Sequence, residues 1–341
     1  MNMADRIGET IKGLEVPPET RAVAAVEPPE VSGELRPRCF AEFVGNELAR
    51  AQVEAAVTTS RRDGEPLPHM LFVGAPGMGK TSLAHVAALE YGARCWIYSG
   101  TAVEDLTDFA LALLNLREND VIFVDEIHAM PHRLAEAWYS AMEDFYIDAP
   151  RKKFMHQGQE IILRSGTIPR FALIAATTNA GGMTKPLLDR FSLRIRLKPY
   201  TAEQLAQIVT QAAPRLARMV TPEAAAAIAQ RAKNTPRLAL ELLKAARLWS
   251  APDAPIDTEA ILTTCHYREI DERGLDALDR EYLAALAGSR IPLGLTTLSG
   301  RLDESPRTIE IIVEPFLLRQ GWIMKSPRGR VLTPAGREIA T

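Results

Sequence analysis

A glycine-rich loop between an apolar run and a helical pattern narrows the choice of folds for this chain. Met70 to Val73 is typical of a buried parallel strand, and a helical pattern follows the loop. The spacing G-x-x-x-x-G-K-[ST] defines a Walker A phosphate loop, and its members are Gly74, Gly79, Lys80 and Thr81. An ordinary glycine turn is the alternative, but chance seldom supplies this spacing together with the Lys-Thr pair. We therefore predict that the chain binds a nucleoside triphosphate.

The residues of this loop have distinct expected roles. Backbone N–H groups and the N-terminus of the following helix can surround phosphates, which Gly77 and Ser82 should help to line. Lys80 offers a cation to the phosphates, and the hydroxyl of Thr81 can hold Mg²⁺. ATP and Mg²⁺ are therefore the expected ligands.

Length and composition place the chain among multidomain globular proteins. With 341 residues it is too long for one compact core, so two or three domains are expected. The formal net charge of −3 gives no global basic field, so any DNA-binding surface must be local. The three cysteines have no metal-binding spacing and suit buried positions in a reducing cytoplasm. Because no membrane-length apolar run or secretory signal pattern is present, we expect a cytoplasmic protein without a membrane segment.

The first 34 residues read as an acidic leader. They contain seven acidic and three basic residues and two Pro-Pro pairs. Such a composition favours a solvated segment, although a short helix around Arg6 to Leu14 could dock on a partner.

A second motif supplies two carboxylates after an apolar strand. The run from Val121 to His128 carries Asp125 and Glu126 at its end, which is the Walker B pattern. Asp125 would hold Mg²⁺ through water, and Glu126 would orient and polarise the attacking water. Acidic residues after a strand are common in loops, but the phosphate loop upstream makes the catalytic interpretation strong.

The remaining pattern of the first 200 residues indicates an α/β domain with a candidate hairpin. Thr178 and Asn179 follow a buried strand, where a polar group can sense the γ-phosphate or position water, or can simply cap a helix. The other expected elements are helices at 47–60, about 104–116 and 133–145, strands at 94–98, 171–176 and 193–197, and a hairpin within 147–170.

Beyond Tyr200 the chain becomes helical and rich in alanine. Helices are expected to open at Thr221-Pro222 and at Thr235-Pro236. Arg237 at the start of the second helix opposes the helix dipole, which a phosphate partner would explain.

The C-terminal segment has the order helix, helix, helix, hairpin, which is that of a winged helix. Its turn carries Lys325, Arg328 and Arg330 with no acid beside them in sequence, and Arg307 lies at the start of the expected recognition helix. Such a basic turn can bind DNA phosphates, or it can be a solvated charged loop; the composition favours neither.

These segments together resemble the RuvB family of AAA+ motors, from Leu35 to about Gly336. Leu35-Arg-Pro-Arg with Phe43-Val-Gly resembles the family's adenine-binding segment, so Leu35 and Arg36 are implied nucleotide contacts. Ala141-Met-Glu-Asp-Phe resembles a block after Walker B that touches nucleotide. The residues that the latter resemblance implies are Glu143, Asp144 and Phe145.

Further blocks complete the resemblance. Ala176-Thr-Thr-Asn-Ala-Gly resembles sensor 1, and Thr235-Pro-Arg resembles sensor 2, which implies a nucleotide contact for Arg237. Leu188-Asp-Arg-Phe resembles the segment whose Arg190 should reach the γ-phosphate in a neighbouring subunit. Tyr200 falls where the family's lid begins, and Ser326-Pro-Arg-Gly-Arg-Val-Leu-Thr resembles its winged helix.

The resemblance implies an architecture and a function. We expect an acidic leader (1–34), an AAA+ large α/β domain (35–198), a helical lid (199–270) and a winged-helix DNA-binding domain (271–341). The implied function is that of a ring-forming ATPase and helicase-type translocase, expected to be a hexamer. It would move duplex DNA at Holliday junctions in recombination and repair.

Two features depart from the family pattern. Arg usually stands at the positions of Asn179 and Leu188, and the turn of the 148–170 hairpin is replaced by Arg151-Lys-Lys. In the family this hairpin docks on RuvA, so docking of a RuvA-like junction-recognition protein is left open. An ATP-gated loader or regulator that does not translocate is the first alternative. A winged-helix transcription regulator is the second.

Overall fold

The computed structural model describes residues 35–101, 113, 116–147, 152–156, 159–163 and 165–340. Within the described helices and strands, the side chains of 132–135, 137, 152–156 and 159–163 are not described. The expected acidic leader, and the expected helix at 104–116 apart from Leu113 and Leu116, lie outside the described residues. The chain divides into two compact units, Met1–Tyr200 and Thr201–Thr341, which we describe separately.

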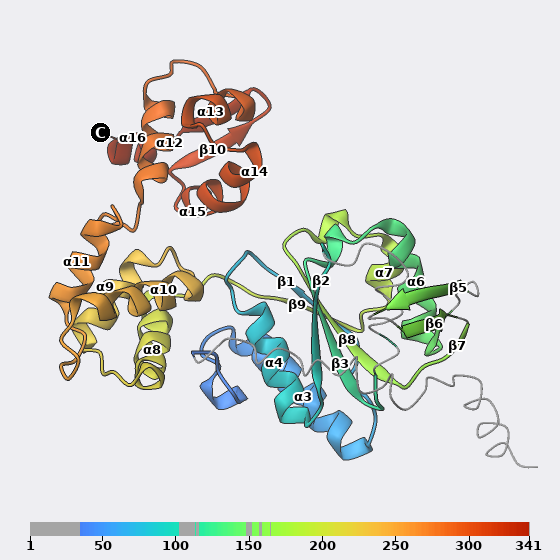
Figure 1. The fold of residues 1–341 in the computed structure, drawn as a ribbon. Coiled ribbons are helices and arrows are strands. Elements are labelled where there is room, and N and C mark those ends of the chain that lie inside the picture. Colours follow the sequence, from blue (N-terminus) through green and yellow to red (C-terminus); the bar gives the residue numbers. More distant parts are fainter. Residues whose placement is uncertain are drawn as a thin grey trace, which may run out of the picture. The chain divides into compact units, whose positions relative to one another are not determined.

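The first unit is an α/β domain, as predicted (Figure 1). Its described strands are β1 (Met70–Val73), β2 (Cys95–Ser99), β3 (Asp120–Asp125), β4 (Tyr146–Ile147), β5 (Lys152–His156), β6 (Gln159–Leu163), β7 (Gly166–Thr167), β8 (Phe171–Thr177) and β9 (Leu193–Arg196). Its described helices are η2 (Phe40–Glu42), α3 (Glu47–Asp63), α4 (Lys80–Tyr91), η3 (Ile127–Ala129), α6 (His132–Glu143), η4 (Ala180–Gly182) and α7 (Lys185–Asp189).

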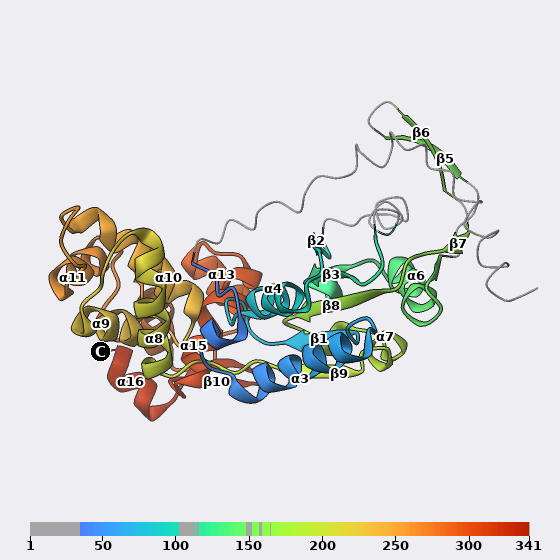
Figure 2. The same ribbon diagram turned by 90° about the horizontal axis from the view of Figure 1, so that it is seen from below.

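The central sheet has five strands in the order β2-β3-β8-β1-β9, and all four neighbouring pairs are parallel. Every residue of β8 is buried, as expected for an inner strand with both faces covered. Helix α4 packs against β2, β3 and β8, and α3 packs on α4. Helix α6 packs against β8 and α7 (Figures 1 and 2). The continuous apolar runs in the sequence therefore correspond to a sheet covered by helices.

The hairpin predicted within 147–170 is confirmed. Strands β5 and β6 pair antiparallel, with Phe154 opposite Ile161 (Figure 2). A second short ladder joins β4 to β7, so the chain leaves and returns to the domain along paired strands.

The second unit begins with a group of helices, as expected from its alanine-rich sequence. These are α8 (Ala202–Ala212), η5 (Ala213–Leu216), α9 (Pro222–Arg231), α10 (Pro236–Ala246), η6 (Arg247–Trp249) and α11 (Thr258–Tyr267). The predicted helix starts at Pro222 and Pro236 are confirmed. The Thr221 hydroxyl accepts from the N–H of Ala224 as an N-cap, whereas the Thr235 hydroxyl donates to the Lys233 carbonyl.

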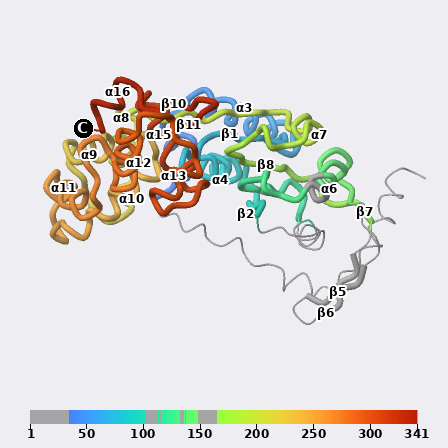
Figure 3. Tube along the Cα trace, turned by 90° about the horizontal axis from the view of Figure 1, so that it is seen from above, coloured from blue at the N-terminus to red at the C-terminus, as the bar shows by residue number. Residues whose placement is uncertain are grey.

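The winged-helix order is also confirmed (Figure 3). The elements are α12 (Ala277–Ala287), α13 (Leu295–Leu302), α14 (Pro306–Thr308), η7 (Ile309–Val313), α15 (Glu314–Arg319), β10 (Ile323–Ser326), β11 (Gly329–Leu332) and α16 (Pro334–Ala340). The third helix runs from α14 through one π-helical segment, η7, into α15. Gly336 is required by close packing, because a Cβ there would lie 1.8 Å from the Trp322 carbonyl oxygen.

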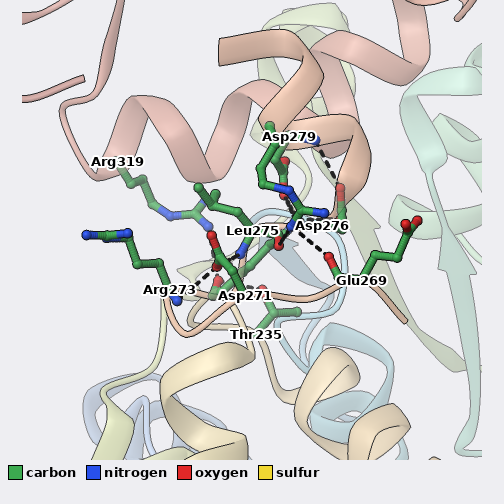
Figure 4. Close-up of polar contacts among 10 residues, drawn as sticks. Thr235, Glu269, Asp271, Arg273, Leu275, Asp276, Asp279 and Arg319 are labelled. Carbon is green, nitrogen blue, oxygen red and sulfur yellow. Dashed lines mark hydrogen bonds and ion pairs between the residues drawn. The ribbon is translucent and has the colours of Figure 1, made fainter. Parts of the chain in front are cut away.

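Polar contacts join the winged-helix elements to the helices before them (Figure 4). Lys233, just before α10, forms ion pairs with Asp276 and Asp279, of which the first N-caps α12. Arg319 donates to the Lys233 carbonyl at 3.4 Å. These contacts connect two groups of helices within the second unit.

Candidate functional site

The strand order brings three sequence motifs to one edge of the sheet. The phosphate loop follows β1, Asp125 ends β3, and Thr178 follows β8, which lies between them. Because the strands are parallel, these carboxyl ends face the same side, where ligands of α/β sheets bind.

The phosphate loop has the backbone conformation that its glycines allow. Gly77 and Gly79 have φ angles of 76° and 89°, and α4 begins directly at Lys80. The Lys80 ammonium donates to the carbonyls of Gly74 at 2.8 Å and Ala75 at 3.1 Å, and the residue is only 6% exposed. The helix N-terminus, the curved backbone and the inward lysine form an anion-binding cradle. Thr81 and Ser82 lie in the first turn of α4.

Residues distant in sequence close this loop from one side. The Tyr200 hydroxyl donates to the Met78 carbonyl at 3.3 Å, and a Cβ on Gly79 would lie 3.3 Å from the hydroxyl oxygen. Burial raises the pKa of Tyr200 to about 12, so the phenol stays neutral and keeps its proton for donation. The prediction that Tyr200 belongs to the nucleotide region is thus consistent with its position.

The segment before α3 also reaches α4. Leu35 is buried, and the pKa of His85 on α4 is lowered by burial and, secondarily, by the positive charge of Arg36. The charge of Arg36 therefore acts on a residue of α4, the helix that begins at the phosphate loop.

Backbone geometry at the end of β3 fixes the two Walker B carboxylates. Glu126 has a left-handed φ of 51°, and its N–H donates to the Asp125 carboxylate at 3.0 Å. Gly100 donates its N–H to the Asp125 carbonyl at 2.7 Å, and a Cβ on Gly100 would lie 2.4 Å from the Glu126 carbonyl oxygen. The β2–β3 pair therefore needs glycine at this point.

Two side chains hold the Glu126 carboxylate. The Thr178 hydroxyl donates to its Oε2 at 3.0 Å, and His128 Nδ1 lies 3.2 Å from the same oxygen. His128 Nδ1 is also 2.9 Å from the Thr177 hydroxyl, which accepts from the N–H of Asn179. Thr178, and not Asn179, is thus the residue in contact with the expected catalytic carboxylate.

His128 was not predicted as a site residue. Its position two residues after Glu126 was visible, but only the 3-10 turn η3 folds its ring back onto the carboxylate. The sequence therefore contained the residue without a signal for its contact.

The contacts of Arg190 are with residues of α6 and α7. It directly follows α7, and its guanidinium lies over the Tyr139 ring. The guanidinium donates to the Glu143 carboxylate at 2.9 Å and to the Pro186 carbonyl at 2.8 Å. Glu143 and Arg190 were predicted separately as site residues, and the structure brings them together. Asp144 follows α6, and Phe145 packs edge-on against Phe171.

A magnesium site would have to use few protein ligands. No group of three or more His, Cys, Asp and Glu side chains that could hold a metal occurs in the described residues. Mg²⁺ at phosphate sites typically takes one or two protein oxygens and completes its shell with phosphate and water. A hydroxyl from Thr81 and a carboxylate from Asp125 fit that requirement.

The fold adds acidic partners to the basic turn of the winged helix. Lys325 and Arg330 have no acid beside them in sequence, but both form ion pairs with carboxylates of the third helix. Lys325 lies 2.5 Å from the Glu314 carboxylate, and Arg330 lies 2.7 Å from the other oxygen of Glu314 and 3.0 Å from Glu310. The turn reverses the chain so that β11 and the third helix meet, which local sequence could not show.

Glu314 is the centre of this network. It is fully buried, and the Tyr282 hydroxyl donates to it at 3.0 Å. Burial acts to raise the pKa of Glu314, but the hydrogen bonds from Arg330 and Lys325 prevail and hold it below its ordinary value.

Three other arginines that were predicted to contact phosphate are exposed to solvent, unlike Arg330, which is tied to Glu314. Arg328, at the tip of the hairpin, is exposed and forms no ion pair with a carboxylate in the described part of the chain. Arg307 and Arg237 are exposed in the first turns of α14 and α10.

Among the residues that the structure covers, no helix combines the length and apolar character that a membrane crossing needs.

Comparisons with known proteins cover all three expected domains. Residues 35–197 match the model of the Holliday junction DNA helicase RuvB P-loop domain, 200–271 the RuvB AAA lid domain and 272–341 the RuvB C-terminal winged helix domain.

Curated relatives and solved structures match over most of their length. The Holliday junction branch migration complex subunit RuvB of Campylobacter fetus is 39% identical over 88% of this chain and 87% of the relative. That of Rubrobacter xylanophilus is 40% identical over 95% and 92%. The structure of the Thermotoga maritima RuvB Holliday junction branch migration motor is 34% identical, with a TM-score of 0.78 over 90% of this chain and 98% of that one.

Proposed function

We infer the function of this chain from the fact that it belongs to the RuvB family, and we propose that it is an ATP-driven motor subunit that moves duplex DNA at Holliday junctions. The observation that carries this proposal is the neighbouring placement of the phosphate loop, the Asp125-Glu126 pair and Thr178 on adjacent strand ends. A nucleotide-gated switch would not need a carboxylate oriented by two side chains.

The chemistry assigned to the site is hydrolysis of the terminal phosphate of ATP. Lys80 and the N–H groups around Gly77 and Gly79 would bind the phosphates. Thr81 and Asp125 would hold Mg²⁺, which supplies positive charge to the phosphate oxygens. Glu126 would orient the attacking water and accept its proton, while Thr178 keeps its carboxylate in place.

Residues outside the loop would complete nucleotide binding. Leu35, Arg36 and Tyr200 are assigned to nucleotide binding beside the phosphate loop. Arg237 is assigned to nucleotide binding because Thr235-Pro-Arg resembles sensor 2. Glu143, Asp144 and Phe145 are assigned to nucleotide binding. Arg190 is assigned to the γ-phosphate in a neighbouring subunit, because Leu188-Asp-Arg-Phe resembles the family segment with that role. An arginine supplied to another subunit's phosphate raises hydrolysis by orders of magnitude. Hydrolysis should therefore require a homo-oligomeric ring, which we expect to be a hexamer.

The DNA contacts are assigned to the winged helix. Arg328 at the hairpin tip and Arg307 at the start of α14 are exposed cations suited to phosphates. Lys325 and Arg330 would act mainly by anchoring the hairpin to Glu314, and they add to the basic character of this surface. The same proposal includes docking of a RuvA-like junction-recognition protein on the β5–β6 hairpin.

The test uses Glu126→Gln in the full chain, with Lys80→Ala as the comparison. Glu126→Gln should retain ATP binding and trap assembled rings while hydrolysis falls by roughly 10³-fold, since the carboxylate orients water but binds no phosphate. Lys80→Ala should weaken nucleotide binding itself. Movement of a four-way junction by the unchanged protein, with and without RuvA, is measured alongside.

Near-normal hydrolysis by Glu126→Gln would overturn the assignment of that residue. DNA-stimulated hydrolysis without directional displacement of the junction would identify a loader in place of a motor.

A further inference from the structure

The guanidinium of Arg190 contacts two side chains of α6, those of Glu143 and Tyr139, and the backbone carbonyl of Pro186 in α7. Tyr139 has no role so far. We propose that Tyr139 is a positioning residue, whose ring holds the Arg190 guanidinium in the orientation needed for the phosphate of a neighbouring subunit. This proposal rests on the proposed function, in which Arg190 acts on that neighbour.

Tyr139 touches both ends of the short helix that carries Arg190. The guanidinium carbon of Arg190, which follows α7, lies 4.4 Å from the centre of the Tyr139 ring. The Tyr139 hydroxyl is 2.8 Å from the hydroxyl of Thr184, the residue that precedes α7. The ring is therefore fixed at its polar end while its face supports the cation.

The ring and the carboxylate hold Arg190 in different ways. Glu143 accepts a hydrogen bond from one terminal nitrogen and Pro186 from the other, so both occupy donors at the edge of the guanidinium. Tyr139 contacts the face and occupies no donor. The buried Nε of Arg190 has no hydrogen-bond partner among the described residues.

This difference determines which contact can persist during hydrolysis. A phosphate oxygen must take edge donors, so it would compete with Glu143, whose side chain is 56% exposed and can move away. It would not compete with the ring, because cation–π contact leaves all five N–H groups available. Tyr139 can therefore keep the guanidinium oriented both before and after it engages the neighbouring subunit.

Orientation matters here because arginine has a long side chain with many rotamers. An arginine that is already in place loses less conformational freedom when the phosphate is engaged. Misplacement of a catalytic group by about 1 Å can lower a rate by up to about 10²-fold.

The test compares Tyr139→Phe, Tyr139→Leu and Tyr139→Met in the full chain, in ATPase assays with assembled protein. Tyr139→Phe keeps the ring and should stay within about threefold of the unchanged protein. The Leu and Met variants lose the ring and should lower kcat by about tenfold with KM for ATP unchanged, because their own phosphate loops are intact. Met has a flexible side chain of similar length, so it serves if the Leu variant fails to fold.

Mixing experiments separate this role from a merely structural one. In a mixture of Tyr139→Leu and Glu126→Gln subunits, some interfaces pair an intact Glu126 with an Arg190 supported by Tyr139. Those interfaces should restore hydrolysis above the sum of the separate proteins. A mixture of Arg190→Ala and Glu126→Gln subunits is the control, and it should recover in the same way.

The outcomes distinguish this proposal from the one on which it rests. No recovery in the Arg190 mixture, although mixed assemblies form, would show that Arg190 does not act on a neighbour. Recovery in that mixture but not in the Tyr139 mixture would overturn the positioning role alone. So would an unchanged kcat in the Leu and Met variants, or equal losses in the Phe and Leu variants.

Discussion

At the scale of single residues, one lysine of this protein forms ion pairs with two carboxylates. Lys233 interacts with two carboxylates, Asp276 and Asp279, and its own pKa is raised by them despite the opposing effect of burial. The two carboxylates differ in exposure, because the side chain of Asp279 is 1% exposed and that of Asp276 is 41% exposed. Burial raises the pKa of Asp279 to about 6 although Lys233 lies beside it, whereas for Asp276 the lysine outweighs burial and the pKa is lowered.

A pH dependence of stability follows from Asp279. Because its pKa is raised on folding from an ordinary value of 3.8, its stabilising contribution is fully present below pH about 4 and is lost as pH rises through about 6. The Asp279→Asn variant has no carboxyl group at this position, so this contribution to the pH dependence is absent from it. The free energy of unfolding of the unchanged protein, relative to that of this variant, should therefore fall between pH 4 and 6. Urea unfolding at several pH values measures it.

The neighbouring Asp276→Asn variant is the matched comparison. The pKa of Asp276 is lowered on folding, so its contribution is present above about pH 4 and is lost at lower pH. Its pH dependence should have the opposite sign. The same sign for both variants would contradict the assignment of Asp279 as the carboxyl that burial disfavours.

At the scale of one element, the β10–β11 hairpin shows that cations two residues apart can have different tasks. Arg330 on β11 is 14% exposed and pairs with a fully buried carboxylate, while Arg328 lies in the two-residue turn and is exposed. The antiparallel register places Arg330 opposite Lys325, so both reach Glu314 on the third helix. The turn residue is left to face solvent or a ligand.

We predict separate effects for the two arginines. Arg328→Ala should leave stability unchanged, weaken binding to unrelated DNA duplexes similarly, and reduce the slope of log affinity against log salt by up to about 0.9 for one phosphate contact. Arg330→Ala should lower the free energy of unfolding by about 1–3 kcal/mol, because Glu314 loses one of its buried partners. Salt titrations and denaturant unfolding test both.

Arg328→Ala and Arg330→Ala serve as controls for each other. An unchanged salt slope in Arg328→Ala would mean that the tip does not contact phosphate. Loss limited to one DNA sequence would favour a sequence-specific regulator, since phosphate contacts do not discriminate among bases.

At the scale of the whole molecule, the phosphate loop and Arg190 belong to different parts of the α/β domain, and the proposed site uses both. Lys80 begins α4, which packs on β2, β3 and β8, while Arg190 directly follows α7, which packs on α6. In the proposed mechanism, the assembly, and not the single chain, is the active unit.

Turnover per subunit should therefore depend on protein concentration. We expect it to fall on dilution below the concentration at which the ring dissociates, and Arg190→Ala should be at least about 10³-fold slower at every concentration. Sedimentation and ATPase assays on the same dilution series measure this dependence. Constant turnover down to concentrations at which only monomers sediment would show that each chain hydrolyses ATP alone.

Much of the fold could be predicted from the sequence because its signals are local. The phosphate loop is defined by the spacing of Gly74, Gly79 and Lys80, and the strand before it by four consecutive apolar residues. The helix starts at Pro222 and Pro236 depend on backbone properties of proline. These features need only a few neighbouring residues, so periodicity and composition determine them.

The contacts that prepare the site depended on tertiary structure. Glu126 meets Thr178 only because β8 lies beside β3, and Arg190 meets Tyr139 only because α6 and α7 pack together. Arg330 reaches Glu314 only because the chain reverses at the hairpin. Sequence by itself determined which chemical groups are present and in which elements they lie. Their pairing required the tertiary structure, because a contact between distant residues leaves no local pattern in the sequence.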